Sequence, residues 1–177
     1  MSQAGPIRIA ILGAESSGKS TLAEALARHY QTNWVEEYLR EFVETFGRVP
    51  LEHEQILIAR TQVERESIAL KQSQRYLFCD TTPIMTEIYS RYCFGRPDPE
   101  VRAIAQSHRY DMTLVSAPDT PWVADGLQRV SDQVRQDIHQ EVLLTLHHMH
   151  IPFTLITGPL TQRLEQVAAL LQNNFKP

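Results

Sequence analysis

The chain has 177 residues, of which 42% are hydrophobic and 21% are charged. This length is usual for one domain, and this composition argues against a disordered or fibrous protein. The 17 Lys and Arg residues against 21 Asp and Glu residues give a formal net charge of -4. This balance excludes the broad cationic surface that non-specific binding to nucleic acid or membranes requires. We therefore expect a small-molecule partner.

The cysteine content and the N-terminal segment bear on the compartment. Two cysteines, Cys79 and Cys93, are too few for the disulfide framework of a small secreted domain. The N-terminal segment lacks the features of a secretion signal, and no apolar run reaches membrane-spanning length. We predict a cytoplasmic protein with one domain, residues 1–177; the sequence does not indicate its oligomeric state.

Short apolar runs alternate with longer amphipathic segments along the chain. Strands are expected at residues 7–12, 33–35, 76–79, 112–115 and 153–156. Helices are expected after residue 18, at 36–46, after Pro50, at 83–94, at about 134–146 and at 160–171. This alternation predicts an α/β fold in which helices cover both faces of a parallel sheet of about five strands.

The first expected strand and the first expected helix are joined by a phosphate-binding motif. Residues 13–20, Gly13-Ala14-Glu15-Ser16-Ser17-Gly18-Lys19-Ser20, match G-x-x-x-x-G-K-[ST] in full, and Thr21 follows. In such a loop, backbone N–H groups surround a polyphosphate, the lysine reaches the β- and γ-phosphates, and the hydroxyl ligates Mg²⁺. A chance match is the alternative, but the flanking strand and helix argue against it. We predict a P-loop NTPase fold that binds ATP and Mg²⁺.

An acidic residue, Asp80, ends the apolar run at residues 76–79. A carboxylate at the carboxyl end of a buried strand suits a Walker-B element, which would place it beside Ser20 and the metal. The alternative is a helix cap ahead of Pro83, because aspartate is common at that position. We favour the metal role, so Ser20 and Asp80 are the predicted metal ligands.

Three further candidates follow the second expected strand. Glu37 could accept the proton of a substrate hydroxyl, Tyr38 could stack on a ring, and Arg40 could hold a phosphate or substrate oxygen. The alternative is the charged start of an ordinary solvated helix. Their position after a strand only slightly favours the functional role.

Residues 117–135 form the predicted lid. Their first part contains two prolines, a glycine and Trp122, which either anchors the loop by packing or touches ligand. Arg129 and Arg135 would reach a phosphoryl group if this segment folds over the site, although solvated helix charges are equally compatible with the pattern. A histidine cluster near residue 148 is not expected to bind metal, because no Cys or acidic residue nearby completes a ligand set.

Several segments together resemble a known family: ILGAESSGKST, EEYLREFV, FCDTTPIMTEIY, WVADGL and IPFTLITG. In this order they are similar to the ribosylnicotinamide (nicotinamide riboside) kinase domain of bifunctional bacterial NAD-biosynthesis regulators. The resemblance covers nearly the whole chain. It implies a kinase of the nucleoside-monophosphate-kinase type that transfers phosphate from ATP, with Mg²⁺, to the 5′-hydroxyl of the riboside. No adenylyltransferase or DNA-binding region is recognised, so a stand-alone kinase is expected.

The resemblance also implies roles for individual residues. Residues 13–21 would hold ATP, and Glu37, Tyr38 and Arg40 would line the riboside pocket. Asp80 would lie beside the metal and the acceptor hydroxyl. Trp122 and Asp125 would belong to the loop that closes over substrate. The chain departs from the family pattern at three positions, Thr82, Ala124 and Gln128, which affects the substrate more than the kinase chemistry.

The leading hypothesis is a kinase in which Lys19 offsets the charge of the moving γ-phosphoryl group. Either Asp80 or Glu37 would orient the acceptor hydroxyl, and the sequence does not choose between them. A regulatory P-loop ATPase and a nucleic-acid-remodelling ATPase are alternatives, whereas a GTPase should also carry an N-K-x-D segment, which is absent. A nucleoside or nucleotide kinase of another base specificity is the nearest competitor.

Overall fold

The computed structural model describes residues 5–96, 98–122 and 131–175. It contains a five-stranded sheet in the order β2-β3-β1-β4-β5, in which every neighbouring pair is parallel. The strands are β1 (Ile7–Leu12), β2 (Asn33–Val35), β3 (Tyr76–Asp80), β4 (Met112–Ser116) and β5 (Thr154–Ile156). The helices are α1 (Lys19–Tyr30), α2 (Tyr38–Phe46), the 3₁₀ turn η1 (Glu52–Glu54), α3 (Gln55–Gln72), α4 (Pro83–Phe94), α5 (Pro99–Gln106), α6 (Asp132–His148) and α7 (Leu160–Asn174).

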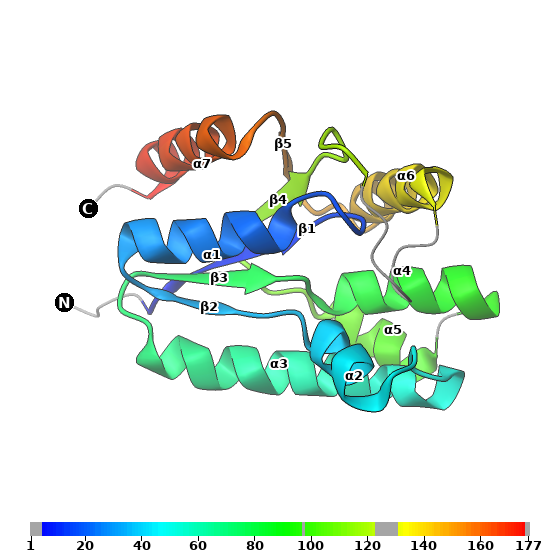
Figure 1. The fold of residues 1–177 in the computed structure, drawn as a ribbon. Helices are drawn as coiled ribbons and strands as arrows, with labels where there is room; N and C mark the ends of the chain where they lie inside the picture. The colour runs from blue at the N-terminus through cyan, green and yellow to red at the C-terminus, as the bar shows by residue number, and fades with distance from the viewer. Residues whose placement is uncertain (1–4, 97, 123–130, 176–177) are drawn as a thin grey trace.

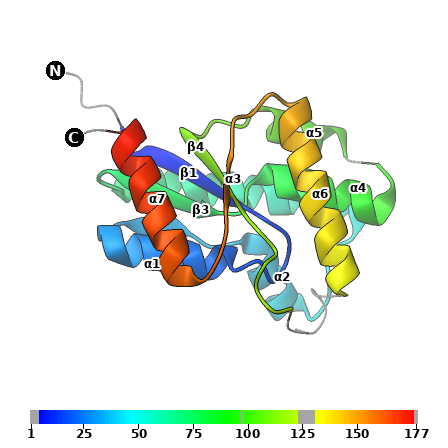
Figure 2. The ribbon, with the colours of Figure 1, turned by 90° about the horizontal axis from the view of Figure 1, so that it is seen from above.

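Helices cover both faces of the sheet because alternate strand residues point in opposite directions. On one face, Ile9 and Ile11 of β1 pack with residues of α1 and α7 in one hydrophobic cluster. On the other face, Leu12 packs with residues of α4, α5 and α6, and a smaller cluster joins β2 and β3 to α3. Figure 1 shows α1 and α3 on opposite sides of the sheet, and Figure 2 shows α7 and α6 on opposite sides of β4. The predicted α/β fold with a parallel sheet is confirmed.

The expected elements agree with the structure except in one segment. Helix α5 was not expected, because the breaker cluster at residues 95–97 suggests that a loop continues to β4. In the structure, the Asp98 side chain accepts hydrogen bonds from the N–H groups of Glu100 and Val101, and Pro99 occupies the first turn. These are ordinary signals for the start of a helix.

The sheet topology determines where a site can form. Strand β1 lies at the centre, between β3 and β4. The turns that follow β1, β2 and β3 therefore meet at the carboxyl edge of the sheet, which is where ligands bind in open α/β sheets. None of the helices that the structure describes is long and apolar enough to cross a membrane.

Near the amino ends of the strands, a partly exposed arginine of β1 pairs with a buried carboxylate of α3. The Glu66 carboxylate of α3 is fully buried and accepts hydrogen bonds from Arg8 Nη2 at 2.9 Å and from the Tyr110 hydroxyl at 2.7 Å. A buried carboxylate needs such partners, because its desolvation is costly.

We expect Arg8→Met to lower the free energy of unfolding by about 3 kcal/mol, because Glu66 would lose its cation and stay buried. Urea denaturation of the variant and the parent measures the difference. A change below about 0.5 kcal/mol, the size usual for surface substitutions, would show that the pair contributes nothing to stability.

Candidate active site

The phosphate-binding motif forms the turn between β1 and α1. Gly13 has a positive φ of 154°, and a Cβ there would lie 2.6 Å from Ser17 Oγ and 2.9 Å from the carbonyl oxygen of Ser116. No side chain fits in that space. Gly18, with φ 79°, is the N-cap of α1, so the helix begins at Lys19 and directs its positive end at the loop.

Ser16 is the residue of this loop other than glycine that has a positive φ. Its φ is 56°, in the left-handed region that costs a residue other than glycine about 1–2 kcal/mol. Its carbonyl oxygen accepts hydrogen bonds from Thr120 Oγ1 at 2.9 Å and from Arg135 Nη1 at 3.3 Å. Contacts from outside the loop therefore help to hold it in this shape.

Lys19 and Glu37 form a largely buried charged pair at the carboxyl edge. Lys19 is only 7% exposed, and its Nζ lies 3.9 Å from Glu37 Oε2. The other oxygen, Glu37 Oε1, accepts a hydrogen bond from Thr81 Oγ1 at 3.1 Å. The P-loop lysine therefore faces a carboxylate that is itself held in place.

Asp80, the last residue of β3, is 1% exposed and has an oxygen, Oδ1, without a hydrogen-bond partner in the described residues. Burial raises the pKa of Asp80 to about 6; Lys19 opposes this shift, and the nearby Glu37 carboxylate adds to it. Asp80 does not cap α4, because Thr82 takes that position and accepts a hydrogen bond from the N–H of Ile84 at 3.4 Å. The cap role that competed with the metal role is thus filled by another residue.

The residues around Asp80 fit a Mg²⁺ ion. The nearby Ser20 hydroxyl lowers the pKa of Asp80, and Arg40 Nη2 donates to Ser20 Oγ at 3.3 Å. A buried carboxylate oxygen without a partner, beside a serine hydroxyl, offers the hard oxygen ligands that Mg²⁺ prefers.

Two hollows meet at Glu37. A cleft of about 400 Å³ is lined by Ser20, Thr21, Glu24, Trp34, Glu36, Glu37, Arg40 and Asp80. A second and much smaller hollow, of about 20 Å³, is lined by Glu37, Leu39, Gln55, Ile58, Gln62, Thr81, Met85, Thr86 and Tyr89. Glu37 is the residue common to both. The arrangement places one carboxylate between a polar space beside the P-loop and a more apolar space between α2, α3 and α4.

Two residues of this site were not singled out in the sequence. Thr81 has φ 73°, which is rare for a β-branched residue, and its hydroxyl donates to Glu37. Gln62 of α3 is buried; its Oε1 accepts from the N–H of Tyr38 at 2.9 Å, and its Nε2 donates to the carbonyl oxygen of Asp80 at 3.4 Å. Thr81 directly follows Asp80, so its place in the sequence could have marked it as a residue of the site. Gln62 lies within a helix, and nothing in the neighbouring sequence marks it as a residue of the site.

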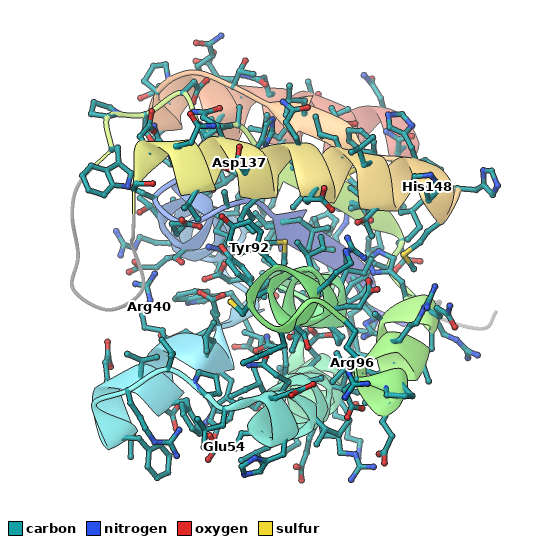
Figure 3. The ribbon with its side chains drawn as sticks, turned by 90° about the vertical axis from the view of Figure 1, so that its right-hand side faces the viewer. Arg40, Glu54, Tyr92, Arg96, Asp137 and His148 are labelled. Carbon is teal, nitrogen blue, oxygen red and sulfur yellow. The ribbon has the colours of Figure 1, made fainter. Side chains whose placement is uncertain are left out.

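Three other residues predicted for the site, Tyr38, Arg40 and Glu15, do not join the group formed by Lys19, Glu37 and Asp80. Tyr38 begins α2, and the Arg65 guanidinium lies 4.7 Å from its ring centroid. Arg40 is exposed on the same helix (Figure 3). Glu15 of the P-loop accepts a hydrogen bond from the Tyr89 hydroxyl at 2.6 Å.

The predicted lid is described only in part. Trp122 is half-buried, and its Nε1 has no hydrogen-bond partner in the described residues. Asp125 and Arg129 lie outside the described residues, as do Ala124 and Gln128. Arg135 is 4% exposed, and its Nη1 donates to the carbonyl oxygens of Ser16 and Thr120. Its predicted contact with a phosphoryl group stays a prediction.

The histidines near the end of α6 form no metal-binding cluster with each other or with acidic residues. No group of three or more His, Cys, Asp or Glu side chains suited to a metal ion occurs in residues 5–96, 98–122 and 131–175. The ring of His147 packs edge-on against Phe153 instead, with the ring centroids 5.3 Å apart.

Comparisons with known proteins show what the chain is similar to. The trifunctional NAD biosynthesis/regulator protein NadR of Escherichia coli (strain K12) is 32% identical over 142 residues, which are 78% of this chain and 35% of NadR. A crystal structure of NadR protein in complex with NR aligns with a TM-score of 0.81 at 23% identity, over 96% of this chain and 52% of that one. Thymidylate kinase from Ehrlichia chaffeensis aligns with a TM-score of 0.68 at 14% identity, over 96% of this chain and all of that one.

These matches confirm the resemblance found in the sequence and the P-loop kinase fold. The chain spans about a third of the length of the curated relative and about half of the solved NadR chain. The model of an AAA domain family matches residues 8–163, from the second residue of β1 to the first turn of α7. The chain therefore belongs to this AAA domain family.

Proposed function

We propose that the chain is a kinase that uses ATP and Mg²⁺ to phosphorylate the 5′-hydroxyl of nicotinamide riboside. The product would be nicotinamide mononucleotide, an intermediate on the way to NAD. The observation that carries this proposal is the buried group of Lys19, Glu37 and Asp80 at the P-loop, with Glu37 between two hollows. The similarity to NadR supports the choice of acceptor.

Each residue in this group has a proposed task. The P-loop N–H groups hold the triphosphate, and Lys19 offsets the charge that develops on the γ-phosphoryl group. Ser20 and Asp80 would hold Mg²⁺, which when bound neutralises phosphate charge and orients the oxygens in line. Glu37, reachable from the second hollow, orients the acceptor hydroxyl and accepts its proton. The sequence left this task open between Asp80 and Glu37.

The second hollow is the proposed riboside pocket; its volume is only about 20 Å³, so α2, α3 and α4 would have to move apart to admit a riboside. The apolar side chains of Leu39, Ile58 and Met85 suit a flat ring, and the amides of Gln55 and Gln62 supply hydrogen-bonding groups. Arg40, which lines the first cleft, and Tyr38, at the start of the same helix, are also proposed to contact substrate. Trp122, Asp125 and Arg129 are proposed to close over the bound acceptor.

A screen of ribosides and nucleoside monophosphates with ATP and Mg²⁺ tests the proposal. Nicotinamide riboside should be the strongest acceptor. A nucleoside or nucleotide kinase of another base specificity is the second candidate, favoured by the likeness to thymidylate kinase, and a preference for such a substrate would establish it instead. ATP hydrolysis without any acceptor would identify a regulatory ATPase.

Lys19→Ala should reduce phosphoryl transfer by about 10²- to 10³-fold, because the lysine acts on charge that develops during transfer. Steady-state turnover of the folded variant gives the measurement. Lys71→Ala, at an exposed position on α3, is the matched control and should keep the parent rate. More than a tenth of the parent rate in Lys19→Ala would contradict the role.

Asp80→Asn should weaken the response to Mg²⁺ and the turnover more than it weakens nucleotide binding, because the loop N–H groups and Lys19 hold ATP. Titration of Mg²⁺ at fixed ATP separates the two effects. Asp137→Asn, an exposed change on α6, serves as the control. A parent-like Mg²⁺ requirement together with parent-like turnover in Asp80→Asn would rule out a metal ligand.

Trp122→Ala should lower kcat/KM for nicotinamide riboside by about 2- to 30-fold, because an indole face attracts the pyridinium cation by about 0.5–2 kcal/mol. Uridine, a neutral riboside, should lose less. Trp122→Phe keeps an aromatic face and should recover part of the loss. An equal drop for both acceptors would mean that Trp122 only anchors the loop.

A further inference from the structure

Two consecutive carbonyl groups of the P-loop are held from outside the loop in the same way. The carbonyl oxygen of Ser16 accepts hydrogen bonds from the Thr120 hydroxyl at 2.9 Å and from Arg135 Nη1 at 3.3 Å. The carbonyl oxygen of Ser17 accepts from the Ser116 hydroxyl at 2.7 Å and from Arg163 Nη1 at 2.7 Å. Each carbonyl therefore has one hydroxyl and one guanidinium donor.

Arg163 of α7 is 2% exposed and uses all of its donor capacity. Its Nε donates to the carbonyl oxygen of Gly158 at 2.6 Å, and its Nη1 donates to Ser17 and to Ser116 Oγ. Its Nη2 donates to Ala117 O at 3.1 Å and to Asp119 Oδ1. A guanidinium has five N–H groups, and all five have an acceptor here. A lysine has three donors on one atom and cannot reproduce this arrangement.

Arg135 reaches the loop from the opposite side, on α6. Asp132 Oδ1 accepts a hydrogen bond from Arg135 Nε at 2.8 Å and lies 2.6 Å from Nη2, so the side chain is held by its own helix. Its Nη1 then donates to the carbonyl oxygens of Ser16 and Thr120. α6 and α7 lie on opposite sides of β4 (Figure 2), so the loop is held from both faces of the sheet.

The geometry of the peptide bond links these contacts to the ligand. The peptide bonds after Ser16 and Ser17 are trans, so the C=O of each residue and the N–H of the next point in opposite directions. Donors that hold the two carbonyls toward the protein therefore turn the N–H groups of Ser17 and Gly18 away from it. Within the described residues, neither N–H donates to a protein acceptor. Both N–H groups can therefore donate to a phosphate oxygen.

We propose that Arg135 and Arg163 are positioning residues that set the direction of these two N–H groups and so prepare the loop for a polyphosphate. In this role they act from behind the loop, through the Ser16 and Ser17 carbonyls. The inference rests on the proposed function only in requiring a nucleotide polyphosphate as ligand. It does not depend on the identity of the acceptor.

Binding without an acceptor tests this proposal. Calorimetric titration with ADP and with inorganic tripolyphosphate gives Kd for the parent and for Thr120→Val, Thr120→Ser, Ser116→Ala and Arg163→Lys. Thr120→Val removes one donor with little change in shape at a half-buried position, so it should fold normally. The Kd for tripolyphosphate should rise about 10-fold in Thr120→Val and at least as much in Arg163→Lys. Thr120→Ser should restore most of the affinity.

Two further readouts separate positioning from general stability. Arg8→Met removes a different arginine, near the amino end of β1 and away from the P-loop. It should lower stability but leave Kd for tripolyphosphate within about twofold of the parent value. In steady-state kinetics, Thr120→Val should raise KM for ATP and leave KM for the acceptor unchanged. If Thr120→Val and Arg163→Lys are folded and bind tripolyphosphate as the parent does, the proposal is wrong. A parent chain that binds tripolyphosphate but does not phosphorylate nicotinamide riboside would overturn the proposed function alone.

Discussion

The site depends on one buried ammonium group, that of Lys19, placed where two carboxylates converge. The first turn of α1 supplies the lysine, the junction of β2 and α2 supplies Glu37, and the end of β3 supplies Asp80. Charges out of water interact strongly, and each is costly to bury alone. The lysine offsets both carboxylates, yet the pKa of Asp80 still rises to about 6 because burial dominates. When bound, a polyphosphate would add negative charge beside Lys19, and a metal ion would add positive charge beside Asp80.

The parallel sheet makes this convergence possible. With β1 at the centre, the P-loop lies next to the carboxyl end of β3, whose last residue is Asp80. Strand β2, on the outer side of β3, brings Glu37 to the same edge. Three segments that are distant in sequence thus supply one charged group each, and the left-handed backbone of Thr81 helps to fix Glu37. The contacts behind the P-loop come from β4, α6 and α7, so nearly every element of the fold has a part in the site.

Much of this was readable in the sequence, and the exceptions have physical causes. The P-loop, Asp80 and all strands carry local signals, namely a fixed motif or an apolar run bounded by turn residues. Helix α5 was missed because a breaker cluster precedes its cap. Gln62 and Arg163 were missed because nothing near them marks a contact with a residue far along the chain; on the helices α3 and α7 they look like ordinary polar positions. The single-domain organisation and the cytoplasmic location stay predictions.

A crystal structure of the chain with ADP, Mg²⁺ and nicotinamide riboside would show whether Lys19, Glu37 and Asp80 lie between a nucleotide and an acceptor. We expect the phosphates within the P-loop, the metal beside Ser20 and Asp80, and the riboside in the hollow between α2, α3 and α4. The 5′-hydroxyl should lie within hydrogen-bonding distance of Glu37. A riboside bound elsewhere, or a 5′-hydroxyl that approaches neither Glu37 nor Asp80, would contradict this expectation.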